Sequence, residues 1–138
     1  MTTWTSTPAR RLYSAVAAAI SLSTAATAAA PTAGAEETCS YELSPPHLAT
    51  LAGGVVQVTA TLTPVACTGS AHPNTNSVCV SAGDSSSKCA TINGWNTAQV
   101  FIDPIGSGHY VSTGNGCVDR SSSLKLTCTP YGPLNGGA

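Results

Sequence analysis

Six cysteines are the residues of this chain whose type and spacing state their chemistry most clearly. They are Cys39, Cys67, Cys79, Cys89, Cys117 and Cys128. Structural zinc sites favour cysteine pairs separated by two to four residues, but the nearest pair here is Cys79 and Cys89. We therefore expect no metal site and no thioredoxin-like redox motif. An even cysteine count in a short chain predicts a disulfide framework where the chain works outside the reducing cytosol.

The spacing of the cysteines favours one set of bridges. Cys79 and Cys89 lie symmetrically about Asp84, so a hairpin that turns there would place them opposite each other, close enough for a bridge. The last two cysteines lie similarly about a pair of serines. The favoured set is therefore Cys79–Cys89, Cys117–Cys128 and Cys39–Cys67, and the main alternative joins Cys39 to Cys128 and Cys67 to Cys117.

Histidine, serine and aspartate are all present, but not in a catalytic pattern. A triad needs a histidine beside a serine and an oriented carboxylate, and a chain this rich in serine contains many coincidental sets. No Gly-x-Ser-x-Gly elbow occurs. The aspartates at 84, 103 and 119 lie in separate expected turns, where aspartate bonds its own backbone. We expect no catalytic residue, no cofactor and no enzyme activity.

Trp95 is the side chain best suited to contact a partner. It lies in the segment Asn93-Gly94-Trp95-Asn96, and a tryptophan in such a loop can anchor a partner or a sugar through a large rigid apolar surface. Packing under the end of a sheet is the competing interpretation. His72 is expected in a polar loop before Pro73. The candidate contact residues are Trp95, Asn96 and His72.

The N-terminus has the three parts of a secretory signal. Arg10 and Arg11 precede an alanine-rich apolar run to about Ala30, and Ala33-Gly34-Ala35 forms an A-x-A site. We expect a helical signal peptide over residues 1–35, cleavage after Ala35, and an extracellular domain over residues 36–138.

The charge of the expected mature chain excludes two classes of partner. Three cationic side chains oppose six carboxylates there, which gives a net charge of −3. So few cations cannot neutralise a run of phosphates or bind an anionic membrane surface. We therefore expect no nucleic acid partner and no membrane association after signal cleavage.

Period-two alternation predicts β-strands. The clearest strand is Val56–Thr63, and Pro64 is expected to end it. Shorter strands are expected at Cys39–Leu43, Ser77–Ser81, Lys88–Ile92, Gln99–Ile102, His109–Thr113 and Leu124–Cys128, with a frayed tail from Gly132. The expected core is Tyr41, Leu43, Val56, Val58, Leu62, Val78, Val80, Ile92, Val100, Ile102, Tyr110, Val118, Leu124 and Leu126. Short strands with frequent turns indicate an all-β sandwich or barrel.

Two resemblances refine this picture. The Cys79–Cys89 segment, the Val100 strand and Gly106 to Tyr110 resemble the neocarzinostatin-like secreted immunoglobulin-fold proteins, over roughly residues 56–118. That resemblance implies a small immunoglobulin-like antiparallel β-sandwich, here with three disulfides, and a cleft for an apolar chromophore. The segment from Cys67 to Pro73 looks like a loop of the subtilisin-inhibitor-like proteins, which implies a Cys67–Cys79 bridge.

These observations favour a small secreted binding or interaction protein without catalysis. Its partner would be an unknown extracellular protein or a small apolar ligand. The alternative is a secreted protease inhibitor with a disulfide-tethered loop. The glycine before Tyr110 also suggests a tyrosine corner, in which the hydroxyl ties the strand to its entering turn.

Overall fold

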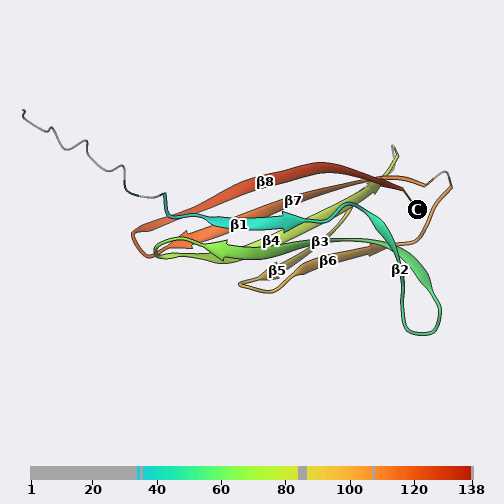
Figure 1. Cartoon of the computed structure of the whole chain (residues 1–138), viewed down its shortest axis with the longest axis horizontal. Helices are drawn as coiled ribbons and strands as arrows, with labels where there is room; N and C mark the ends of the chain where they lie inside the picture. Colours follow the sequence, from blue (N-terminus) through green and yellow to red (C-terminus); the bar gives the residue numbers. More distant parts are fainter. Residues whose placement is uncertain (1–33, 35, 84–86, 107, 138) are drawn as a thin grey trace, which may run out of the picture. The chain divides into compact units, whose positions relative to one another are not determined.

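The computed structural model describes residues 34, 36–83, 87–106 and 108–137. Within these residues the chain forms eight β-strands joined by turns, and no helix that could span a membrane occurs there (Figure 1). The strands are β1 Cys39–Leu43, β2 His47–Thr50, β3 Val56–Cys67, β4 Ala71–Ala82, β5 Lys88–Asn93, β6 Ala98–Ile102, β7 His109–Arg120 and β8 Ser123–Gly137. The predicted signal peptide, apart from Gly34, lies outside the described residues.

The strands form two antiparallel sheets. In the first, which we call the β3 sheet, β6 pairs with one edge of β3, while β1 and β2 pair with successive parts of the other edge. In the second, the β4 sheet, the order is β5-β4-β7-β8. The predicted all-β fold with antiparallel sheets is confirmed.

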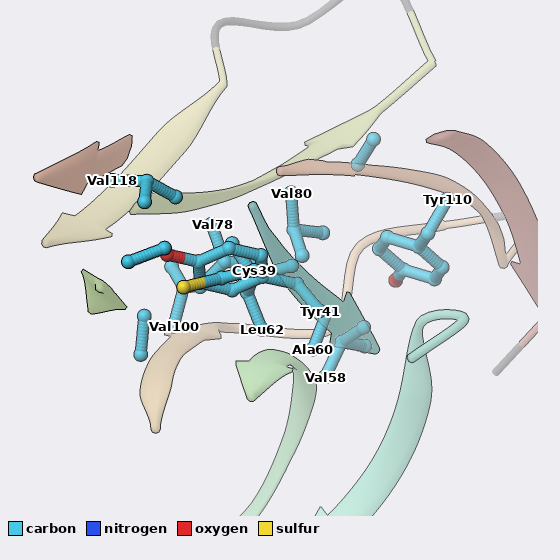
Figure 2. Close-up of a cluster of buried hydrophobic side chains, with 13 residues drawn as sticks. Cys39, Tyr41, Val58, Ala60, Leu62, Val78, Val80, Val100, Tyr110 and Val118 are labelled. Atoms are coloured by element: carbon cyan, nitrogen blue, oxygen red, sulfur yellow. The ribbon is translucent and has the colours of Figure 1, made fainter. Parts of the chain in front are cut away.

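Side chains from both sheets share one buried cluster. Along β3, Val58, Ala60 and Leu62 point inward and are fully buried. Val78 and Val80 of β4 alternate in the same way, and Figure 2 shows these side chains gathered in one cluster. Complete burial of a valine or leucine side chain stabilises a fold by about 1.5–3 kcal/mol, so this alternation determines which face of each strand points inward.

Polar contacts and a close glycine approach join β1 to β7. The Tyr41 hydroxyl donates to the Cys117 carbonyl at 3.1 Å, and the Ser112 hydroxyl donates to the Ser44 carbonyl at 2.8 Å. The Tyr41 ring lies directly over Gly116, where a Cβ would come within 2.6 Å of it. A side chain at position 116 would therefore have to displace this ring.

Three disulfides each join strands that are antiparallel neighbours. Cys39–Cys67 links β1 to β3, Cys79–Cys89 links β4 to β5, and Cys117–Cys128 links β7 to β8. These are the pairs that the cysteine spacing favours, and the competing pairs are not formed. Three disulfides in a small domain are compatible with an extracellular location.

Prolines end fewer strands than the sequence predicts. β3 continues through Pro64 to Cys67, because Pro64 lies beyond the last β6 pair at Leu62 and beside a bulge at the next residue. The expected loop around His72 is also wrong, because β4 starts at Ala71 and a bulge follows Pro73. A proline beside a bulge or on a free edge removes no ladder hydrogen bond.

The C-terminal tail does not fray as expected. β8 runs to Gly137 and pairs with β7 as far as His109. It passes through Pro130 and Pro133 because β8 is an edge strand. The short strand β2 was not predicted at all.

Four residues expected in the core are exposed. They are Val56, Ile92, Leu124 and Leu126. Val56 begins β3 at the β2–β3 hairpin, and Ile92 lies on the edge strand β5. The two leucines lie at the start of β8, next to the β7–β8 hairpin, and β8 is an edge strand. The Tyr110 hydroxyl accepts from the Ile105 N–H at 2.8 Å and donates to the Ile105 carbonyl, so it ties β7 to the turn that enters it.

Candidate functional site

Trp95 lies on the turn from Asn93 to Thr97 that joins β5 to β6, which we call the Trp95 turn. Its side chain is 57 % exposed, so the competing interpretation as a core residue is wrong. Gly94 has a φ of +67°, a conformation that side-chain-bearing residues rarely adopt. The Asn-Gly step therefore allows the tight turn that brings Trp95 to the surface.

Asn76 of β4 holds the Trp95 turn from beneath. Its side chain is fully buried, and Nδ2 donates to two turn carbonyls, that of Gly94 at 2.7 Å and that of Asn96 at 2.8 Å. The carbonyls on both sides of Trp95 are thus tied to one amide group. A backbone segment held at two points has little freedom to rotate.

The oxygen of the same amide has no hydrogen-bond partner among the described residues. A buried polar atom without a partner costs about 1–3 kcal/mol. An apolar side chain at this inward position of β4 would avoid that cost, but it would leave the turn carbonyls without donors. The two hydrogen bonds to the turn, rather than core packing, therefore explain why an asparagine occupies this position.

Three further hydrogen bonds fix the ends of the turn. The Gly94 N–H donates to the Asn74 carbonyl at 2.9 Å, and Asn96 Nδ2 donates to the Asn93 carbonyl at 2.9 Å. The Thr97 hydroxyl lies 3.1 Å from the Thr63 hydroxyl of β3. The turn is consequently connected to β3, β4 and β5, and Trp95 is presented on a preorganised backbone.

The other two predicted contact residues have different places. Asn96 is exposed and belongs to the turn itself. His72 is exposed on β4, opposite Asp119 of β7, and its Nδ1 lies 3.3 Å from the Ser70 carbonyl. Trp95 and Asn96 are neighbours within the turn, whereas among the described residues no hydrogen bond joins His72 to it.

Charged side chains are sparse around the turn. Across β3, β4, β5 and β6, Lys88 supplies the one formal charge. It lies at the far end of β5, about 16 Å along the strand from Asn93. Asp119 on β7 accepts a hydrogen bond from the amide of Asn74. The surface that carries Trp95 is therefore nearly uncharged.

A separate polar cluster anchors the N-terminal segment. Glu37 accepts hydrogen bonds from the hydroxyls of Ser122 at 2.6 Å and Ser70 at 2.9 Å, and its carbonyl accepts from Arg120 Nε. The hydrogen bonds from Ser122 and Ser70 lower the pKa of Glu37. This cluster ties the start of the domain to the β7–β8 hairpin, which is a structural role. The serine hydroxyls bond a carboxylate here rather than a histidine.

A small cavity opens near the other end of β4. Its volume is about 180 Å³, and it is lined by Ala82, Gly83, Ile105, Gly106 and His109. Pockets that bury a drug-sized ligand measure roughly 300–1,000 Å³. This cavity is too small to enclose a chromophore.

The described residues contain no group of three or more His, Cys, Asp or Glu side chains that could hold a metal ion. Comparison of the chain with protein-family models, curated proteins and solved structures found no match. The candidate site is therefore argued from the side chains of the domain itself, and the Trp95 turn is the exposed segment held by the most hydrogen bonds described above.

The sequence analysis missed Asn76, although a lone amide at an inward position of an alternating strand is a visible signal.

Proposed function

We propose that residues 36–138 form an extracellular binding domain without catalytic activity, which contacts its partner through Trp95. One observation carries the proposal. An exposed tryptophan lies between two carbonyls that a single buried amide, Asn76, holds at 2.7 and 2.8 Å. Preorganisation of this kind lowers the entropy lost on binding, and tryptophan is the residue most enriched among side chains that dominate binding energy.

The cost of the buried amide supports the same conclusion. A domain of this size has a small stability margin, yet it keeps a fully buried asparagine with an unpaired oxygen. A turn that only connected β5 to β6 would not need a buried asparagine whose unpaired oxygen lowers the stability of the fold. Binding by the exposed indole gives the fixed turn a purpose.

Export and fold type belong to the same proposal. The anchoring of the first residues supports a mature chain that starts at Glu36, because the Thr68 hydroxyl donates to the Glu36 carbonyl at 2.8 Å and accepts from the Thr38 N–H. The order of β1, β2, β3 and β6 in one sheet and β5-β4-β7-β8 in the other supports an immunoglobulin-like sandwich. The resemblance to neocarzinostatin-like proteins stays a prediction.

The two other functions considered have less support. Carriage of an apolar ligand has only the cavity of about 180 Å³ near Ile105. Protease inhibition was suggested by a Cys67–Cys79 bridge, whereas Cys67 is bonded to Cys39. The Trp95 turn is tight, with a left-handed glycine, rather than an extended loop that a protease could bind.

The proposal is tested by measuring whether the domain binds to the surface of the cells that produce it. Fluorescently labelled domain is incubated with washed cells, and the retained fraction is compared between the wild type and Trp95→Ala. Ile105→Ala is the matched control, because Ile105 is also an exposed apolar residue, at 51 %, but lies by the distant cavity. We expect retention that falls with Trp95→Ala and not with Ile105→Ala. Retention of none of the three proteins, or equal retention of all three, would contradict the proposal.

A further inference from the structure

We propose that the ligand of the Trp95 turn is a neutral glycan chain. This inference rests on the proposed binding function and adds the chemical class of the partner. It follows from the pairing of one rigid exposed indole with a surface of amide and hydroxyl groups that carries almost no charge.

The chemistry of the turn matches that of a sugar ring. A pyranose has an apolar face of C–H groups and a rim of hydroxyls. The indole of Trp95 offers a flat apolar face, and in the described part of the chain its N–H has no hydrogen-bond partner. The adjacent side chains of Asn93, Asn96 and Thr97 are exposed and uncharged. Residues 93–97 thus offer both an indole on which a sugar ring can stack and polar side chains that can hydrogen-bond its hydroxyl groups.

The polar surface continues beyond the turn. Thr97 is paired with Thr63 through their hydroxyls, and Gln99, two residues further along β6, is exposed and donates to Thr59. Successive outward residues of a strand are about 7 Å apart. Thr97 and Gln99 therefore extend the polar surface beside Trp95 by about the length of one further sugar unit, so we expect oligosaccharides to bind better than monosaccharides.

The charge distribution selects neutral over acidic glycans. No cation lies on the turn, on β3, on β4 or on β6, and Lys88 is at the far end of β5. An acidic polysaccharide would therefore find no partner for its carboxylates or sulfates at the site. Asp119, whose carboxylate accepts from Asn74, and the net charge of −3 on residues 36–138 would repel it.

A protein partner fits this surface less well. The centre of a protein interface is usually a packed apolar patch with several anchor residues. Here the exposed apolar residues on the neighbouring strands are single aliphatic side chains, Ile92 on β5 and Val65 two residues beyond Thr63 on β3. One aromatic ring among small polar side chains is closer to the composition of a sugar-binding surface.

The test is a titration of residues 36–138 with defined oligosaccharides, followed by the fluorescence of Trp95 and by calorimetry. The neutral probes are cellohexaose, maltohexaose and chitohexaose, and the acidic probe is hexagalacturonate. We expect at least one neutral probe to change the Trp95 emission at millimolar concentration. Trp95→Ala should weaken its binding at least tenfold, as for other anchor residues, and Trp95→Phe should lose less. Ile105→Ala should bind as the wild type does.

Three results would overturn the inference. They are no binding of any neutral probe, equal binding by Trp95→Ala, and binding of hexagalacturonate as tight as that of the neutral probes. Failure here is distinguishable from failure of the proposed function. If cell retention depends on Trp95 while all neutral probes fail, the site binds something other than a neutral glycan. If retention does not depend on Trp95 and no neutral probe binds, both proposals fail.

Discussion

Replacement of Asn76 by aspartate changes one donor group into an acceptor without changing the shape of the side chain. An ionised carboxylate cannot donate to the Gly94 and Asn96 carbonyls, which now accept from Asn76 Nδ2 at 2.7 and 2.8 Å. A protonated carboxyl group can still donate to one of them. Because the position is fully buried, the folded protein should keep the new carboxyl protonated, and its pKa should be raised.

The size of the effect follows from that protonation. pH 7 lies about three units above the ordinary pKa of aspartic acid. Keeping the buried carboxyl protonated at that pH therefore lowers the free energy of unfolding by about 4 kcal/mol. The lost hydrogen bond adds about 1 kcal/mol. The sign is that of a raised pKa: the folded state binds a proton that the unfolded chain releases, so the variant is least destabilised below the ordinary pKa and loses stability as the pH rises. We expect a loss of about 5 kcal/mol at pH 7 and about 1–2 kcal/mol at pH 4.

The assay is urea unfolding followed by circular dichroism, with the wild type measured at each pH. Asn115→Asp is the matched control, because Asn115 is exposed on β7, and its loss should stay within about 0.5 kcal/mol. An Asn76→Asp variant that is unfolded at pH 7 but folded at pH 4 would also agree with this pH-dependent loss of stability. Equal stability of the two variants at pH 7, or a loss at Asn76→Asp that does not shrink toward pH 4, would refute the role assigned to Asn76.

Three further substitutions test the packing, the N-terminal cluster and the exposure of the indole. Gly116→Ala should destabilise the domain by about 1–3 kcal/mol in urea unfolding, because its Cβ would lie 2.6 Å from the Tyr41 ring, whereas Gly137→Ala, with 3.6 Å to its nearest neighbour, should be neutral; equal effects would contradict the packing. Hydrogen bonds lower the pKa of Glu37, so its contribution should be complete above about pH 4.5 and lost as the pH falls through the lower folded pKa; Glu37→Gln should flatten that part of the stability profile, and an unchanged profile would count against it. Trp95→Ala should change the free energy of unfolding by less than about 1 kcal/mol, and a loss typical of a buried tryptophan, about 3–5 kcal/mol, would place the ring in the core.

Local patterns in the sequence predict the strands better than they predict where the strands end. The alternation of Val58, Ala60 and Leu62 correctly gives the inward face of β3. Pro64 misleads because a proline ends a ladder only where a neighbour needs its N–H, and pairing partners are not visible in one strand's sequence. The same limit explains the continuation of β8 past Pro130.

Exposure at a sheet edge depends on the order of strands, which periodicity does not contain. Leu124 and Leu126 alternate as core residues do, yet they are exposed at the start of the edge strand β8, next to the β7–β8 hairpin. In the candidate site, the Gly and Asn residues around Trp95 correctly indicated an exposed turn. The inward amide of Asn76 is visible in the alternation of β4, but its partners are not, because the two hydrogen bonds join residues 18 and 20 positions apart.

The central claim is that Trp95 is exposed and held rigidly for binding. It is tested most directly by the fluorescence of residues 36–138, in which Trp95 is the sole tryptophan because Trp4 precedes the domain. The account predicts red-shifted emission that iodide quenches, together with anisotropy that decays at the rate of whole-domain rotation. Blue-shifted emission that iodide cannot reach, or fast independent rotation of the indole, would contradict it.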